Sequence, residues 1–165
     1  MYAISICNLQ QLVEIDESQI EQIVRDALDS EQVAAAEVSV AVVDDARMRQ
    51  LNRTHLGHDY PTDVLSFLLE CRLETAADLN PPADRPGSGR RLDGEIVVSA
   101  DTARREAVRF GWPAGHELLL YVVHGTLHLC GYVDSPDEER ERMRRREVEI
   151  LQIRGLTPHY ELTAR

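Results

Sequence analysis

The sequence has no lysine, few aromatic residues and only three cysteines, and each shortage narrows what the protein can do. All 18 basic residues are arginines and 29 residues are acidic, so the formal net charge is −11. Proteins that bind DNA through a broad basic surface have the opposite balance, and we expect no DNA partner. An odd number of widely spaced cysteines does not make a disulfide framework and fits a reducing compartment.

Long apolar runs are also missing. The most apolar stretch, ELLLYVVHGTLHL (117–129), is too short to cross a bilayer and contains polar residues. The first residues, MYAISICNLQQ, lack the charged and apolar regions of a secretory signal. We therefore expect a cytoplasmic protein with no membrane partner.

The length, the composition and the hydrophobic pattern of the sequence predict one α+β domain over residues 1–165, with about four strands and five helices. A length of 165 residues and a hydrophobic fraction of 43% suffice for a real core. The nearly continuous apolar run at 64–69 is typical of a central strand. The segment at about 71–92 is rich in proline and glycine and predicts a mobile surface loop. The other expected strands are 2–7, 37–43 and 95–98, and the expected helices are 18–28, 45–57, 99–110, 114–130 and 136–154.

Two histidines stand out within the most apolar of these helices. His124 and His128 are four residues apart, so both imidazoles lie on one helix face, about one turn apart. Gly131 can end the helix, and Asp134 follows, which gives the pattern H-x-x-x-H-x-x-G-x-x-D. Two imidazoles and one carboxylate predict a three-ligand site for one Zn²⁺ per chain, with the fourth position open to water.

The same pattern allows other readings. Asp134 could instead cap the next helix, although Ser135 is better placed, because S-P-D-E at 135–138 reads as a capping box with proline at the first helical position. The pattern also resembles the extended zincin protease motif, in which a glutamate general base follows the first histidine. Gly125 occupies that position here and would leave room for a bulky substrate beside the metal. A zinc metallopeptidase is therefore the second reading.

Four separated segments resemble one known family. HGTLHLCGY (124–132) looks like the signature of the YbeY family of zinc-dependent endoribonucleases. LNRTHLGHDYPTDVLSF (51–67) and DGEIVVSADTARREA (93–107) are similar to its other motifs, and RRREVEILQIRGL to its C-terminal helix. The resemblance implies a mixed four-stranded sheet with a zincin-like metal helix, and single-stranded RNA as the substrate. It also implies a role in small-subunit ribosomal RNA processing and ribosome biogenesis, with the ribosomal particle as a partner.

The sequence departs from this family at two positions. The family's metal ligands are three histidines, and Asp134 stands at the third position. Zinc accepts carboxylate oxygen, but the added negative charge makes it a weaker Lewis acid. Most members carry an arginine where this chain has Leu56, and Arg53 or His58 could replace it. These two changes leave open a non-catalytic ribosome-assembly factor that keeps the fold and a structural zinc.

Three further residues are candidates for supporting roles. Asp63 could orient a metal-bound histidine, or could cap the loop that enters the strand at 64–69. Tyr60 and Tyr132 are the aromatic residues nearest the site in the sequence, and either could stack on an RNA base. Tyr132 could instead pack under the turn that follows the metal helix.

Overall fold

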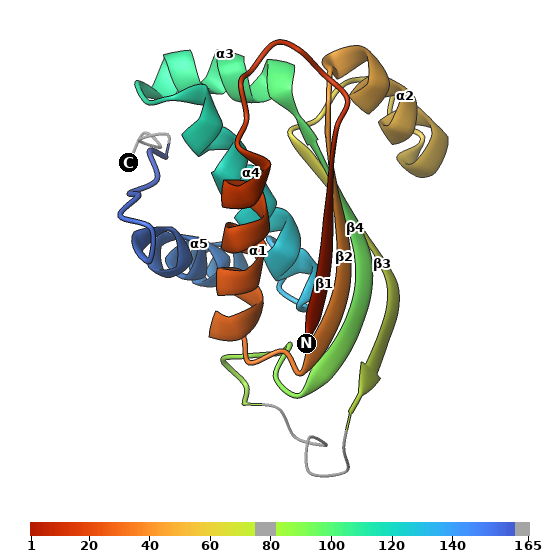
Figure 1. Ribbon diagram of the computed structural model, residues 1–165, viewed down its shortest axis with the longest axis vertical. Helices are drawn as coiled ribbons and strands as arrows, with labels where there is room; N and C mark the ends of the chain where they lie inside the picture. The colour runs from red at the N-terminus through yellow and green to blue at the C-terminus, as the bar shows by residue number, and fades with distance from the viewer. Residues whose placement is uncertain (75–81, 161–165) are drawn as a thin grey trace.

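The computed structural model describes residues 1–74 and 82–160, and in these residues a single sheet carries four strands (Figure 1). The spatial order is β1-β2-β4-β3; β1, β2 and β4 run parallel, and β3 is antiparallel to β4. The strands are β1 (Tyr2–Asn8), β2 (Ala35–Val43), β3 (Val64–Leu73) and β4 (Arg90–Ser99). The helices are α1 (Glu17–Ser30), α2 (Asp45–Leu56), α3 (Ala100–Phe110), α4 (Ala114–Leu129) and α5 (Asp137–Gln152). The predicted α+β fold with a mixed sheet is confirmed.

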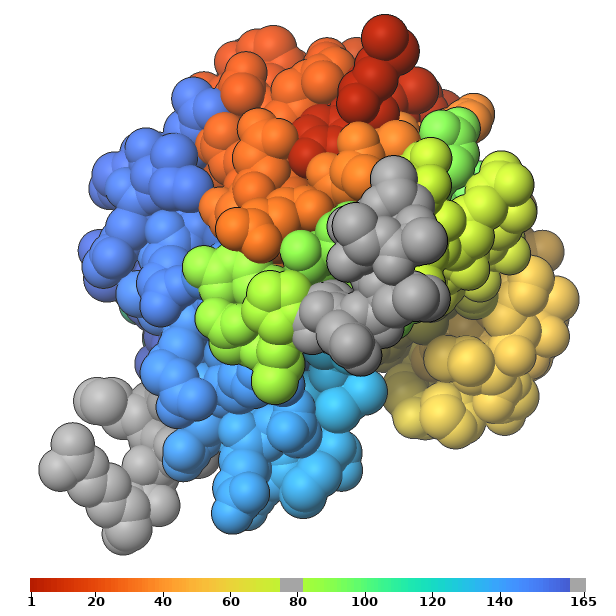
Figure 2. All heavy atoms as spheres, turned by 90° about the horizontal axis from the view of Figure 1, so that it is seen from below, coloured from red at the N-terminus to blue at the C-terminus, as the bar shows by residue number. Residues whose placement is uncertain are grey.

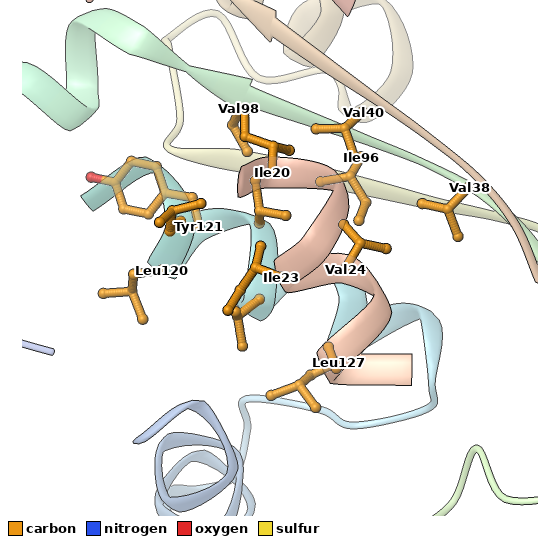
Figure 3. Close-up of a cluster of buried hydrophobic side chains, with 14 of the residues drawn as sticks. Ile20, Ile23, Val24, Val38, Val40, Ile96, Val98, Leu120, Tyr121 and Leu127 are labelled. Carbon is orange, nitrogen blue, oxygen red and sulfur yellow. The ribbon is translucent and has the colours of Figure 1, made fainter. Parts of the chain in front are cut away.

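The main core lies between one face of the sheet and the helices α1, α4 and α5. Figure 1 shows these helices and α3 on one side of the sheet, with α2 on the other. In Figure 3, side chains of α1 such as Ile20 and Val24 point toward Val40 and Ile96 of the sheet. The apolar stripe predicted for α1 is buried, and so is the predicted inward face of β2. Sequence periodicity therefore identified the main core.

The position of β3 was predicted wrongly, because it lies at the edge of the sheet and not in its centre. Its first residues are covered on both faces, by α4 on one side and by a small cluster with Met48 of α2 on the other. Farther along, Leu68 and Leu69 are 48% and 59% exposed. The two interior strands are β2 and β4, and β4 was expected only as a short strand at 95–98.

The predicted loop at 71–92 is shorter than expected at both ends. Cys71–Leu73 belong to β3 and Arg90–Leu92 to β4, and these residues pair with one another. Residues 75–81 lie outside the described part of the chain. Residues 82–89 lie against the molecule, and Figure 2 shows them between α1 and the blue surface of α5. Arg85 donates a hydrogen bond of 2.8 Å to the carbonyl oxygen of Ser30 at the end of α1.

Helix α4 packs very closely on β3 and β4 at Gly125. A Cβ atom at this position would lie 2.7 Å from Cγ2 of Ile96 and 3.1 Å from Oγ of Ser66. The Ser66 hydroxyl also donates to the carbonyl oxygen of Gly125 at 3.2 Å. Gly125 therefore faces the sheet, and the expectation that it leaves room for a substrate is wrong.

Among the described residues, no helix is long and apolar enough to cross a membrane.

We expect Gly125→Ala to destabilise the protein by about 1–3 kcal/mol, because the added methyl group forces α4 away from the sheet. Gly115→Ala is the matched control in the same helix, since a Cβ there meets nothing within 4 Å. It should stabilise the helix by up to about 1 kcal/mol. Urea unfolding in the presence of a chelator measures both. Equal midpoints for the two variants would contradict the close contact.

Candidate metal centre

Three side chains converge at the end of α4. Nε2 of His124 lies 3.0 Å from Nε2 of His128, and the two nitrogens lie 3.8 Å and 3.6 Å from Oδ2 of Asp134. Four-coordinate zinc with bonds of about 2.0–2.1 Å separates its ligand atoms by roughly 3.3 Å. The observed separations fall on either side of this value. These residues therefore form a group that could hold a metal ion.

Each imidazole is oriented by a hydrogen bond from its other nitrogen. Nδ1 of His124 lies 2.6 Å from Oε1 of Glu147, and Nδ1 of His128 lies 3.0 Å from the carbonyl oxygen of Tyr132. Both partners accept hydrogen bonds, so in the neutral rings the proton sits on Nδ1 and the lone pair on Nε2. The two lone pairs then face each other across 3.0 Å. A proton or a metal ion between the two nitrogens removes this repulsion, so the donor set fits a cation such as a metal ion.

The charges around the two histidines shift their pKa values in opposite directions. Burial acts to lower the pKa of His124, but the hydrogen bond and negative charge of Glu147 outweigh it, and the pKa is raised. Burial and the neighbouring His124 lower the pKa of His128. The pair is therefore electrostatically unequal, with the carboxylate of Glu147 on one side only.

The turn that carries Asp134 is held by the ring of Tyr132. This ring is 2% exposed, and its hydroxyl lies 2.8 Å from both Oε2 of Glu31 and the carbonyl oxygen of Asp84. Glu31 also pairs with Arg146 of α5 at 2.6 Å, in a contact that is almost fully buried. Tyr132 therefore packs under the turn, and its burial excludes it as a base-stacking residue.

Helix α5 does not begin with the predicted capping box. Its N-cap residue is Pro136, which makes no side-chain hydrogen bond, and the helix begins at Asp137. Ser135 lies one residue too early to cap it. The side chain of Asp134 points toward the histidines, while its carbonyl oxygen accepts a hydrogen bond of 3.2 Å from Nε of Arg140.

The metal group lies at the wall of a cavity of about 540 Å³. The cavity is bounded by residues 61–63, α3, α4, α5 and the segment after α5, and both His124 and Asp134 line it. Within the described part of the chain, its charged lining consists of three arginines, Arg105, Arg140 and Arg144, and five acidic residues, Asp63, Glu106, Glu117, Asp134 and Glu147. A negatively charged ligand could reach the metal group here while contacting guanidinium groups.

Comparisons with known proteins identify the family of the chain. The family model for endoribonuclease YbeY matches residues 5–155. The chain belongs to the endoribonuclease YbeY family. A relative from Desulfitobacterium hafniense, named Endoribonuclease YbeY, is 41% identical over 121 residues, which cover 73% of each chain. Another of that name, from Moorella thermoacetica, is 43% identical over 140 residues, or 84% of this chain and 86% of the relative.

A solved structure shows the same fold. The solution structure of TM1509 from Thermotoga maritima superposes with a TM-score of 0.53 at 24% identity, over 93% of this chain and 91% of that one. Together with the YbeY family match, this confirms the fold predicted from the sequence. The prediction of a hydrolytic enzyme of the endoribonuclease class is confirmed at the level of the family.

Of the other candidates in this chain, three lie outside the cavity and one lines it. Arg53, His58 and Tyr60 are exposed, and none of them is among the described residues that line the cavity. Leu56, at the position of the family arginine, is 51% exposed. Asp63 does line the cavity, but its carboxylate accepts hydrogen bonds from the backbone N–H of Val64 and from Thr62. It therefore caps the entry to β3.

Sequence reasoning missed Glu147, the residue that orients His124. It is 3% exposed and lies on the same side of α5 as the buried Met143, Ile150 and Leu151. A glutamate at helical spacing within an apolar stripe was the available signal, because a buried carboxylate requires hydrogen-bond donors. The arginines and glutamates around it concealed this pattern.

We expect Glu147→Gln to weaken metal binding by about 10–100-fold, since removing the charged partner of a ligating histidine usually costs this much. The amide keeps the size of the side chain. Glu141→Gln, an exposed position on the same helix, is the matched control and should bind as the wild type does. Competition with a chromogenic chelator measures both affinities. A similar affinity in both variants would exclude this role for Glu147.

Proposed function

We propose that this protein is a zinc-dependent endoribonuclease that cleaves single-stranded RNA. His124, His128 and Asp134 would hold one zinc ion. The observation that carries the proposal is the pair of facing Nε2 atoms, each oriented through its other nitrogen, beside a cavity whose lining includes three arginines. Membership of the YbeY family supports RNA as the substrate.

The residues around the site have separable tasks. Zinc in this position would activate a water molecule for hydrolysis and offset negative charge at the phosphate. Glu147 and the carbonyl oxygen of Tyr132 keep the two imidazoles oriented toward the metal position. Asp134 gives the ligand set one more negative charge than three histidines would, so the site should be a weaker Lewis acid than a three-histidine centre.

The three arginines of the cavity offer contacts for the phosphates of a flexible strand. Arg105 and Arg140 each pair with an aspartate, at 2.6 Å and 3.2 Å, and Arg144 stacks on Tyr160. A single strand can bend its backbone into a recess more easily than a rigid A-form duplex can. Family membership thus supports RNA as the substrate, and the recess supports a single strand over a duplex.

The biological role that we propose is ribosomal RNA processing in the cytoplasm as part of ribosome biogenesis, with the ribosomal particle as a partner. The match to the family model over residues 5–155 and the similarity to the named endoribonucleases support this role and the treatment of the chain as one domain. A zinc peptidase and a non-catalytic assembly factor are the two alternatives that the experiments below distinguish.

Purified wild-type protein should contain about one zinc per chain, and Asp134→Ala should lose most of it, because two ligands bind more weakly than three. Asp137→Ala removes an exposed carboxylate three residues away and should retain the metal. Elemental analysis gives the zinc content. If the wild type holds no zinc even when zinc is supplied during purification, the assembly-factor role becomes the better explanation.

The zinc-loaded protein should cleave single-stranded RNA and lose this activity with a chelator, and added zinc should restore it. His124→Ala should be inactive, and a duplex of the same sequence should be cut more slowly. Gel analysis of labelled RNA gives the rates. Chelator-sensitive cleavage of casein without RNA cleavage would indicate a peptidase. Binding to pre-ribosomal particles without any RNA cleavage would indicate an assembly factor.

A further inference from the structure

The segment after α5 returns to the metal cavity. The family match ends at residue 155, and residues 156–160 continue beyond it. Figure 1 shows this segment leaving α5 and running up toward the corner between α3 and α4. Leu156 packs on the core, and Nδ1 of His159 lies 2.9 Å from the carbonyl oxygen of Phe110. The imidazole of His159 also stacks on the ring of Trp112, with centroids 4.9 Å apart.

This attachment brings Tyr160 to the carboxylate that orients the metal group. The hydroxyl of Tyr160 donates a hydrogen bond to Oε2 of Glu147, and Oε1 of the same carboxylate contacts Nδ1 of His124. Burial and the charge of Glu147 raise the pKa of Tyr160, so the hydroxyl keeps its proton and remains the donor. A continuous hydrogen-bonded chain thus runs from Tyr160 through Glu147 to His124.

The ring of Tyr160 makes a second contact on the same helix. The guanidinium carbon of Arg144 lies 5.1 Å from the ring centroid, within the range of a cation–π interaction. Arg144 and Glu147 are three residues apart on α5, so one tyrosine can contact both side chains. Both also line the cavity. Tyr160 therefore contacts the group that orients His124 and one of the arginines that face the cavity.

We propose that Tyr160 is a positioning residue for this site. Its hydroxyl holds Glu147 against His124, and its ring holds Arg144 where the guanidinium can meet an RNA phosphate. The inference rests on the proposed function for the zinc ion and the RNA. It extends the site to a residue outside the segment that the family match covers.

The burial of Glu147 explains why the hydroxyl should matter. The side chain is 3% exposed, and a buried carboxylate must be satisfied by donors other than water. His124 provides one donor and Tyr160 provides another. Without the hydroxyl, Oε2 loses its bond, and the carboxylate is less firmly held in the orientation that His124 needs.

Two substitutions separate the hydroxyl from the ring. Tyr160→Phe removes only the hydroxyl and should lower zinc affinity by about 3–10-fold, less than the loss expected for a direct partner of a ligand. The KM for single-stranded RNA should stay within about twofold, because the ring still supports Arg144. Tyr160→Leu removes both features and should add a rise in KM of about 2–5-fold. With saturating zinc, kcat should change little in either variant.

The control is Tyr2→Phe on β1. It removes a hydroxyl that donates a hydrogen bond of 2.8 Å to the carbonyl oxygen of Val33. It should change neither zinc affinity nor KM. Chelator competition gives the zinc affinity, and steady-state cleavage of labelled RNA gives KM and kcat. If Tyr160→Leu does not fold, as judged by circular dichroism, Arg144→Gln replaces it and should raise KM with unchanged zinc affinity.

Wild-type zinc affinity in Tyr160→Phe would overturn the role of the hydroxyl. An unchanged KM in Tyr160→Leu, or in Arg144→Gln, would overturn the role of the ring. Both failures are distinct from failure of the proposed function, in which the wild type itself would bind no zinc or cut no RNA.

Discussion

The close contact between α4 and the sheet is the constraint on which the site depends. The helix is buried over most of its length, and Gly125 lets its backbone approach β3 and β4. This contact fixes the rotation of α4, and with it the position of His124 at the cavity wall and of His128 beside it. A larger residue at position 125 would turn or lift the helix, and both imidazoles would move with it.

Helix α5 then orients the two imidazoles through neighbouring residues. Glu147 contacts His124 directly. Arg146 acts indirectly: it pairs with Glu31, which accepts a hydrogen bond from the hydroxyl of Tyr132. The backbone carbonyl oxygen of Tyr132 in turn accepts a hydrogen bond from His128. Consecutive residues on a helix point about 100° apart, so they reach different neighbours. One helix therefore supports both ligands, and a shift of α5 would disturb the two histidines together.

Local patterns predicted much of this structure, and non-local contacts account for what they missed. The stripe of α1, the inward face of β2 and the His124–His128 pair follow from helix and strand periodicity, which a sequence displays directly. The edge position of β3 depends on strand pairing, and a run of apolar residues in the sequence looks the same in an edge strand and in a central strand. Glu147 lies 23 residues from His124, and Tyr160 a further 13 residues on, so no spacing rule relates them to the metal ligands.

The hydrogen bonds that orient the histidines also affect the thermodynamics of metal binding. In small zinc domains the ligands come together only when the ion binds, so the free energy of metal binding drives folding. Here Glu147 and the backbone of Tyr132 restrain both rings by contacts within the protein. Little conformational entropy remains to be lost when an ion binds. The fold should thus survive removal of the ion, and metal exchange should proceed without unfolding.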